Sequence, residues 1–365
     1  MRTFFPGFYS LRDEQIEELW NSAVLVLDTN VLLDLYRVSP ETQSDLLSLL
    51  CHFGEQGRLW IPYQVAFEYH DDLYGVVFDQ MKKYDDTLKI LNDFLGSISQ
   101  KRNHPFLDDS LIRRVKNLMR DIEKYFNSQK QKLKHSSEDS SLKGKIADFF
   151  DGKIGTPFSE QDLNNIYADG KQRYAKKIPP GYEDQKKGEP GMYKDLILWK
   201  EILKYSMEND VSIIFVSSDT KEDWFLIKKG KTICPHPQLI KEFQDETGQK
   251  IILYSLERFM GLAKEKNVVT IQDDSIEEVK SKDISTFDTS SYMEKVQEIL
   301  KNVDASSGNN GFNSFRQRML QHTRFSDVQH DLSDLILGST SSTSASNVVE
   351  NNESDSALGT VPDKD

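Results

Sequence analysis

A run of four apolar residues at positions 24–27 ends abruptly at Asp28, and this stretch constrains the fold more than any other. So short a run of Val and Leu is typical of a strand that is buried on both faces of a parallel sheet. Apolar residues then recur at helical spacing over positions 31–36, so the chain turns from strand into helix. Open α/β sheets bind ligands beside the carboxyl ends of their strands. Asp28 is therefore a candidate site residue, although capping of the following helix explains it equally well.

The same alternation of short apolar runs and helical patterns continues along the chain. Strands are predicted at 58–61, 211–216 and 250–254, and helices at 10–20, from Ser39, from Pro62, and at 192–203, 237–246 and 256–264. Strands that alternate with helices form a parallel sheet with helices on both faces. The predicted fold class is α/β, with three layers around a central parallel sheet.

A long helical stretch from about residue 72 to 174 interrupts this pattern. Its apolar residues follow helical spacing, and Asn103-His104-Pro105 marks a turn, so we expect an inserted helical hairpin. The second arm of the hairpin is basic, with Arg113, Arg114, Lys116, Arg120, Lys124, Lys130, Lys132 and Lys134. A solvated helix face accounts for most such charge runs, and a surface that follows phosphate groups is the alternative.

The α/β domain, including this insertion, is expected to span residues 1–265. An accessory and partly helical segment is expected over 266–337, with short helices at 292–300 and 315–320. From residue 338 the chain is acidic, rich in Ser, Thr and Asn, and free of aromatic residues. This composition is typical of a disordered tail.

Composition and charge bear on whether the protein spans a membrane, is secreted or binds nucleic acid. No apolar run reaches the roughly 18 residues of a membrane span, and Pro6 interrupts the N-terminus before a signal-peptide core forms. Cys51 and Cys234 provide no disulfide framework, so a cytoplasmic location is expected. The net charge is −13, but residues 266–365 carry 9 Lys and Arg against 17 Asp and Glu, and so hold most of it. A nucleic-acid substrate is therefore not excluded.

Acidic residues lie at or near the ends of the predicted strands. Asp28 and Asp219 end strands, Glu68 lies in the helix after the second strand, Asp195 opens another helix, and Asp223 follows Asp219 by four residues. Carboxylates that meet at one sheet edge repel one another unless a cation neutralises them. Oxygen ligands suit Mg²⁺ or Mn²⁺, and two such ions would activate a water and stabilise the departing oxygen in phosphodiester cleavage. The sequence therefore predicts a site for Mg²⁺ or Mn²⁺.

Five blocks in order resemble the bacterial PIN-like nuclease family. They are Leu27-Asp28-Thr29-Asn30, then Ile61-Pro62 with Phe67-Glu68-Tyr69, then Ile178-Pro179-Pro180-Gly181-Tyr182, then Tyr193-Lys194-Asp195-Leu196-Ile197-Leu198-Trp199-Lys200, and then Ser218-Asp219-Thr220-Lys221-Glu222-Asp223-Trp224. The N-terminal Phe5-Pro6-Gly7-Phe8-Tyr9-Ser10 also fits, and the resemblance spans about residues 1–262.

The resemblance implies a PIN-like fold and a metal-dependent nuclease. Its catalytic and metal-ligating acids would be Asp28, Glu68, Asp195 and Asp219, with Asp223 as an additional ligand. Lys194 stands where the family usually has Gly, and its longer side chain would either crowd the metal or contact a phosphate.

Further residues are secondary candidates. Asp184 and Asn30 are candidate auxiliary residues, and Lys221, Lys186, Lys187 and Arg37 are candidate phosphate contacts, although each of these cations would equally well be a solvated surface charge. His70 is expected to be structural, because it lies on a different helix face from Glu68.

The expected activity is hydrolysis of phosphodiester bonds in nucleic acid, with endonucleolytic cleavage of RNA favoured over DNA. The resemblance places such proteins in bacterial defence or stress responses, and the hairpin or the C-terminal segment would bind a partner protein. A catalytically weak nucleic-acid-binding or scaffold protein on the same frame is the alternative. A phosphatase with an aspartyl nucleophile is disfavoured, because its usual second Asp would fall at Asn30.

Overall fold

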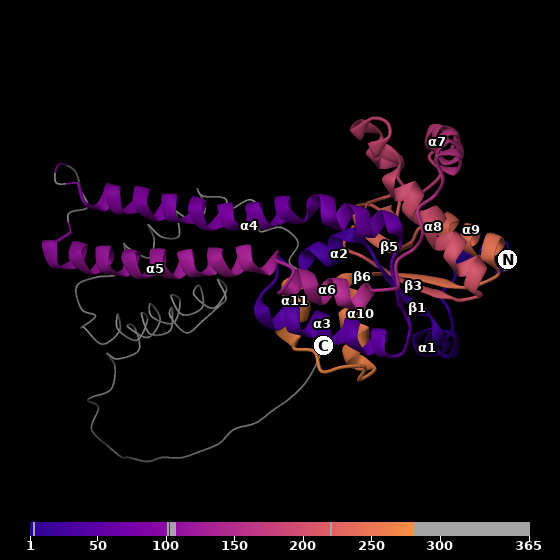
Figure 1. The fold of residues 1–365 in the computed structure, drawn as a ribbon, viewed down its shortest axis with the longest axis horizontal. Helices are drawn as coiled ribbons and strands as arrows, with labels where there is room; N and C mark the ends of the chain where they lie inside the picture. The colour runs from indigo at the N-terminus through magenta and orange to yellow at the C-terminus, as the bar shows by residue number, and fades with distance from the viewer. Residues whose placement is uncertain (3, 101, 103–106, 220, 281–365) are drawn as a thin grey trace, which may run out of the picture. The chain divides into compact units, whose positions relative to one another are not determined.

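The computed structural model describes residues 1–280, except for 3, 101, 103–106 and 220 (Figure 1). The turn expected at Asn103-His104-Pro105, the helices expected at 292–300 and 315–320, and the tail expected from residue 338 lie outside the described residues. In the described part of the chain, no helix is both long and apolar enough to cross a membrane.

A four-stranded parallel sheet lies at the centre of the fold (Figure 1). Its strands follow the order β2-β1-β3-β6. The strands are β1 (Val24–Leu27), β2 (Leu59–Trp60), β3 (Ile213–Ser217) and β6 (Ile251–Ser255). Leu25 lies opposite both Leu59 and Ile214, and Ile214 lies opposite Ile252. All residues of β1 and β3 are buried, as expected of a parallel sheet that is covered on both faces. The predicted α/β class with a central parallel sheet is confirmed.

Helices provide the two covering layers. Around the sheet lie α1 (Asp13–Ser22), α2 (Thr29–Asp34), α3 (Pro40–Glu55), α8 (Lys194–Asn209), α9 (Pro237–Thr247), α10 (Leu256–Glu265) and α11 (Asp273–Lys280). Leu25 of β1 packs with Leu46 of α3 and Phe259 of α10. Phe215 of β3 points to the opposite face, since successive strand residues alternate, and its ring packs at a tilt of 35° against Trp224, with a ring-centroid distance of 5.2 Å.

The inserted hairpin consists of two long helices that lie side by side, α4 (Tyr63–Ile98) and α5 (Asp109–Ser136) (Figure 1). Tyr84 of α4 packs edge-on against Phe126 of α5, and Lys130 of α5 pairs with Asp85 of α4 at 2.7 Å. The first arm does not begin inside the insertion. Instead, α4 starts directly after β2 and runs without a break from the α/β core into the hairpin.

The remaining elements connect these parts. They are the 3₁₀ helices η1 (Pro6–Phe8), η2 (Tyr182–Lys187) and η3 (Gly191–Tyr193), the helices α6 (Leu142–Phe150) and α7 (Glu160–Ala175), and the strands β4 (Phe225–Lys228) and β5 (Lys231–Pro235). The antiparallel β4–β5 pair was not predicted. Lys229-Gly230, where both residues have a positive φ, is the turn signal between two short apolar runs that would have indicated it. Packing also continues past residue 265, because α11 contacts α3 and α10.

Candidate active site

Asp28 and Asp219 follow adjacent parallel strands, and the structure places both at the same end of the sheet. Leu27 at the end of β1 lies opposite Val216 of β3. The hydroxyl of Ser217, the last residue of β3, donates to Asp28 Oδ2 at 2.7 Å and accepts the backbone N–H of Asp219 at 2.9 Å. This serine therefore fixes both acidic positions with respect to each other.

Asp28 also caps the helix that follows it. Its Oδ1 accepts the backbone N–H of Thr29 at 2.7 Å, at the start of α2. The two roles considered for this residue are thus compatible, because one oxygen faces the helix and the other faces Ser217.

Glu68 reaches the same region from the second turn of α4. Its Oε2 accepts a hydrogen bond from the Thr29 hydroxyl at 3.4 Å, and its Oε1 accepts one from Gln64 Nε2 at 2.5 Å. The Lys194 ammonium lies 3.9 Å from Oε1 of Glu68. The lysine that replaces the expected glycine thus provides a positive charge beside this carboxylate.

Lys221 places one ammonium group among three further carboxylates. Its Nζ lies 2.8 Å from Asp219 Oδ2, 3.2 Å from Asp184 Oδ1 and 4.0 Å from Asp195 Oδ2. Asp219 comes from the end of β3, Asp184 from η2 and Asp195 from the first turn of α8. Segments that are distant in sequence therefore meet around one cation, which is the arrangement that mutually repelling carboxylates require.

Burial dominates the electrostatics of Asp28. Desolvation raises the pKa of its carboxyl group to about 6, the Ser217 hydrogen bond opposes this, and the nearby charges of Glu68 and Asp219 add to it. A carboxyl group whose pKa is raised by burial and by like charges is typical of a functional site.

Asp195 behaves in the same way. Desolvation raises its pKa to about 7, the positive charge of Lys221 lowers it, and the charges of Asp28 and Asp184 raise it. Burial alone would lower the pKa of Lys221, but its hydrogen bond to Asp219 and the neighbouring carboxylates outweigh burial and raise it. The indole N–H of Trp224 donates to Asp195 Oδ2 at 3.2 Å and orients the carboxylate.

Asp223 anchors a loop, whereas Asp219, Asp184 and Asp195 surround Lys221. Its Oδ2 accepts the backbone N–H groups of Gly181 at 3.0 Å and Glu183 at 3.2 Å, while its Oδ1 is buried and has no hydrogen-bond partner among the described residues. Gly181 has a φ of +91°, and a Cβ atom there would lie 2.3 Å from the Tyr174 hydroxyl oxygen. This anchored loop leads into η2 and so places Asp184 beside Lys221.

The other secondary candidates are spread around this cluster. Lys187 pairs with Asp184 at 2.7 Å, whereas Arg37 pairs with Asp34 at 2.8 Å. Asn30 and Lys186 are exposed to solvent. The His70 ring hydrogen-bonds the carbonyl oxygen of Ala66 in its own helix at 2.7 Å, in line with the structural role expected for it.

Sequence reasoning missed two acids. Asp34 accepts a hydrogen bond from the Ser218 hydroxyl at 2.7 Å, which ties α2 to the end of β3. Glu201 is buried in α8, where Oε2 accepts the backbone N–H of Gln64 at 2.9 Å, and desolvation raises its pKa to about 7. The available signal for Glu201 was an acidic residue among the apolar residues of an amphipathic helix.

The donor chemistry of the cluster suits a hard divalent cation, because every candidate ligand is a carboxylate oxygen. Lys221 already occupies the centre of three of these carboxylates, where a positive charge is favoured. Among the described residues, no group of three or more His, Cys, Asp or Glu side chains is arranged to hold a metal ion as the side chains stand. The carboxylates of the cluster therefore fit a divalent cation by charge and by donor type, and the Lys221 ammonium provides the positive charge among them.

Comparison with known proteins identifies the family. The model of a family described as "PIN like domain" matches residues 24–239, which is more than half of the chain. No curated protein and no solved structure matches the chain. The matched range contains all six acids of the cluster, namely Asp28, Glu68, Asp184, Asp195, Asp219 and Asp223. The chain belongs to the PIN-like domain family.

Proposed function

We propose that this protein is a metal-dependent nuclease that cleaves phosphodiester bonds within RNA. The observation that carries the proposal is the meeting of Asp28, Asp195, Asp219 and Asp184 at one end of the sheet, with Lys221 among them. PIN-like domains are in general metal-dependent nucleases, so membership of the family supports the same conclusion.

Mg²⁺ or Mn²⁺ would be held by Asp28, Asp195 and Asp219, with Glu68 and Asp184 beside them. A bound ion would supply an activated water and stabilise the departing oxygen. Neighbouring side chains orient the carboxylates that would hold the ion. Ser217 orients Asp28, and Trp224 orients Asp195.

Two cations lie where substrate phosphates would arrive. Lys194 lies 3.9 Å from Glu68 Oε1, and Lys187 lies 2.7 Å from Asp184 Oδ2. The Lys187 side chain is more than half exposed, and that of Lys194 about one third. Each can therefore turn toward an incoming phosphate, because Asp184 keeps its pair with Lys221 and Glu68 keeps its hydrogen bond from Gln64.

Substitution of Asp28 by Asn tests the proposal. Loss of groups that merely support metal ligands costs roughly 10- to 100-fold in activity, so loss of a ligand should cost more than about 100-fold. Cleavage of labelled single-stranded RNA and DNA of one sequence is measured with Mn²⁺ for wild type, Asp28→Asn and the exposed control Asp148→Asn. Equal cleavage by wild type and Asp28→Asn would exclude the assignment.

A second candidate is a nucleic-acid-binding protein with little activity. The position of Lys221 favours it, because an ammonium at the centre of the acids competes with a metal. Calorimetric titration with Mn²⁺ separates the two functions. Saturable binding that is lost in Asp28→Asn supports the nuclease, and its absence from the wild type supports the binding protein.

A further inference from the structure

The outer side of α5 carries a row of positive charges, with a gap between Lys124 and Lys134. We define the basic face as the exposed residues Arg113, Lys116, Arg120, Lys124 and Lys134. On an ideal helix these five positions lie within about 80° of one another, and the row is about 31 Å long. The opposite, apolar side of α5 packs on α4, as the contact between Phe126 and Tyr84 shows.

None of the five side chains of the basic face is ion-paired with a carboxylate in the described part of the chain, and Glu123 is the one exposed acid of α5 that lies among them. The exposed acids of the hairpin lie mainly on the other arm, at Asp71, Asp72, Asp79, Asp86 and Asp93 of α4. α5 therefore attracts polyanions more strongly than α4, whose exposed acids outnumber its exposed lysines Lys82, Lys83 and Lys89.

α4 carries a second unusual feature, which is a row of exposed aromatic rings. We define the aromatic face as Tyr63, Phe67, Tyr74 and Phe78, whose exposed fractions are 39%, 52%, 49% and 63%. Their spacing of four, seven and four residues places them on one side of the helix. Tyr63 and Phe67 are nearly parallel, with ring centroids 6.5 Å apart. Phe67 lies in the same turn of α4 as Glu68, about 100° around the helix axis from it, so this face begins at the level of the acidic cluster.

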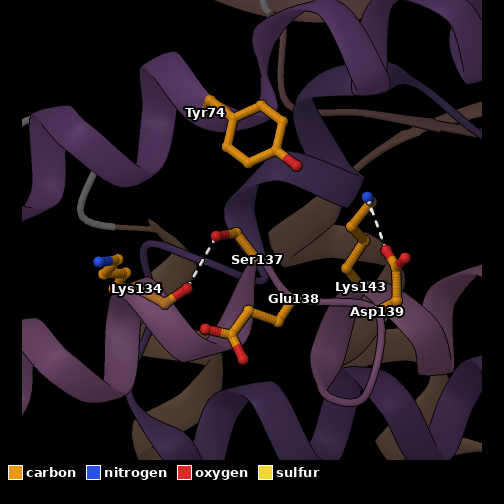
Figure 2. Close-up of a pocket in the computed structure, with 6 residues that line it drawn as sticks. All are labelled: Tyr74, Lys134, Ser137, Glu138, Asp139 and Lys143. Carbon is orange, nitrogen blue, oxygen red and sulfur yellow. Dashed lines mark hydrogen bonds and ion pairs between the residues drawn. The ribbon is translucent and has the colours of Figure 1, made fainter.

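The two faces meet at a hollow at the base of the hairpin. The hollow has a volume of about 410 Å³, and Tyr74 of α4 and Lys134 of α5 both line it. Figure 2 shows the Tyr74 ring above the hollow, with Lys134 on one side and Lys143 on the other. The Lys143 ammonium pairs with Asp139 at 2.8 Å and lies 5.9 Å from the centre of the Tyr74 ring. The end of the basic face thus adjoins the middle of the aromatic face.

We propose that the two faces together bind single-stranded RNA and lead it to the acidic cluster. Proteins that bind single strands combine a row of positive charges along the backbone with aromatic rings on which bases stack. Here the phosphates of one part of the strand lie along α5, and the bases of the part nearer the acidic cluster stack on α4. The two parts meet at the hollow that Lys134 and Tyr74 line. A duplex would fit poorly, because its bases are already stacked and paired. This inference rests on the proposed nuclease function for the identity of the ligand.

The basic face is tested by the salt dependence of binding. Anisotropy of a fluorescent single-stranded RNA of about 20 nucleotides is measured without metal in the Asp28→Asn protein, so that no cleavage occurs. Combined Lys116→Gln, Arg120→Gln and Lys124→Gln should reduce the slope of log K against log salt by about 2, because each phosphate contact contributes about 0.7. A matched control changes Lys82, Lys83 and Lys89 of α4 to Gln. An unchanged slope in the α5 variant, or an equal change in the control, would overturn the proposal.

The aromatic face is tested separately. Phe67→Ala combined with Phe78→Ala should weaken binding of the single strand by about 5- to 150-fold for each lost stacking contact, with an unchanged salt slope. Both side chains are exposed, so the fold should persist, and circular dichroism checks this. Duplex RNA of the same sequence should show no such loss. Unchanged binding of the single strand by the variant, or equal losses for both RNAs, would overturn the proposal.

The two proposals fail in different ways. RNA that binds through both faces but is not cut by wild type with Mn²⁺ supports this inference and contradicts the nuclease function. Cleavage that depends on Asp28, with binding that is insensitive to both sets of variants, contradicts this inference alone.

Discussion

The hydroxyl oxygen of Ser217 lies 2.7 Å from Oδ2 of Asp28 and so joins the ends of two neighbouring parallel strands. This hydrogen bond lowers the pKa of a carboxyl group that burial otherwise raises to about 6. Ser217→Ala should therefore raise the pKa of Asp28 and move the acidic limb of the pH–activity profile to higher pH. The free energy of unfolding should fall by about 1–2 kcal/mol. Ser22→Ala, which removes an exposed hydroxyl, is the control, and an acidic limb that does not move would contradict the role of Ser217.

Replacing Lys221 by Met should reveal its role as an internal cation. Without the ammonium, Asp219, Asp184 and Asp195 repel one another, and the metal-free protein should lose about 1–3 kcal/mol of unfolding free energy, since Lys221 is partly exposed. Mn²⁺ should bind the variant more tightly and recover this loss. Urea unfolding with and without Mn²⁺, together with calorimetry, measures both effects. Lys228→Met, which removes an exposed ammonium outside the cluster, serves as the control. Weaker Mn²⁺ binding to Lys221→Met would show that the ammonium does not stand in for the metal.

The stability of the metal-free protein should depend on pH through Asp28 and Asp195. Burial raises their pKa values to about 6 and about 7, whereas both should be near 4 in the unfolded chain. Between about pH 4 and pH 7 the folded protein binds more protons at these two carboxyl groups than the unfolded chain does. Their contribution to the unfolding free energy therefore falls as the pH rises through this range. Above pH 7 the contribution should be constant.

The substitution Asp195→Asn isolates the contribution of Asp195 to the pH dependence of the unfolding free energy. Asp195→Asn cannot ionise, so unfolding in urea with EDTA at pH 5, 6.5 and 8 should show a smaller decrease with pH than in wild type. Mn²⁺ should also reduce the decrease in wild type, because it stabilises the ionised carboxylates. Identical pH dependence in the variant and the wild type would contradict the assignment.

Gly181 is expected to be irreplaceable for two separate reasons. Its φ of +91° disfavours other residues, and a Cβ atom there would overlap the Tyr174 hydroxyl at 2.3 Å. Gly248 has the same left-handed conformation, with a φ of +70°, but a Cβ atom there would meet no neighbour within 4 Å. Gly248→Ala should therefore cost about 1 kcal/mol. Gly181→Ala should cost clearly more and also lower nuclease activity, because it displaces the loop that leads to Asp184. Equal losses of stability and activity in the two variants would contradict this.

The sequence was sufficient to predict those features that follow from strand direction. Carboxyl ends of adjacent parallel strands share one edge, so Asp28 and Asp219 were expected together, and β1 and β3 place them so. Glu68 and Asp195 followed from their positions at the starts of helices next to the sheet. Each of these expectations depends only on local periodicity and on one topological rule.

Other features depend on tertiary contacts that periodicity does not encode. The place of Lys221 among three carboxylates is set by the turn after β3 and by the separate loop that carries Asp184. Glu201 bonds to the backbone of Gln64 across 137 positions of sequence, so the local pattern of α8 marks the acid but not its partner. The charge of α5 was visible in the sequence, but the exposed rings of α4 resemble ordinary core positions until packing shows which side of the helix is covered.

The continuity of α4 has a mechanical consequence. Glu68 and the far end of the hairpin belong to one unbroken helix of 36 residues, so no hinge separates the acids from the arm that carries the aromatic rings. A continuous helix of this kind holds the aromatic rings at a fixed distance from Glu68. An RNA strand that is bound along this arm would then be cleaved at a fixed number of nucleotides from the bound segment.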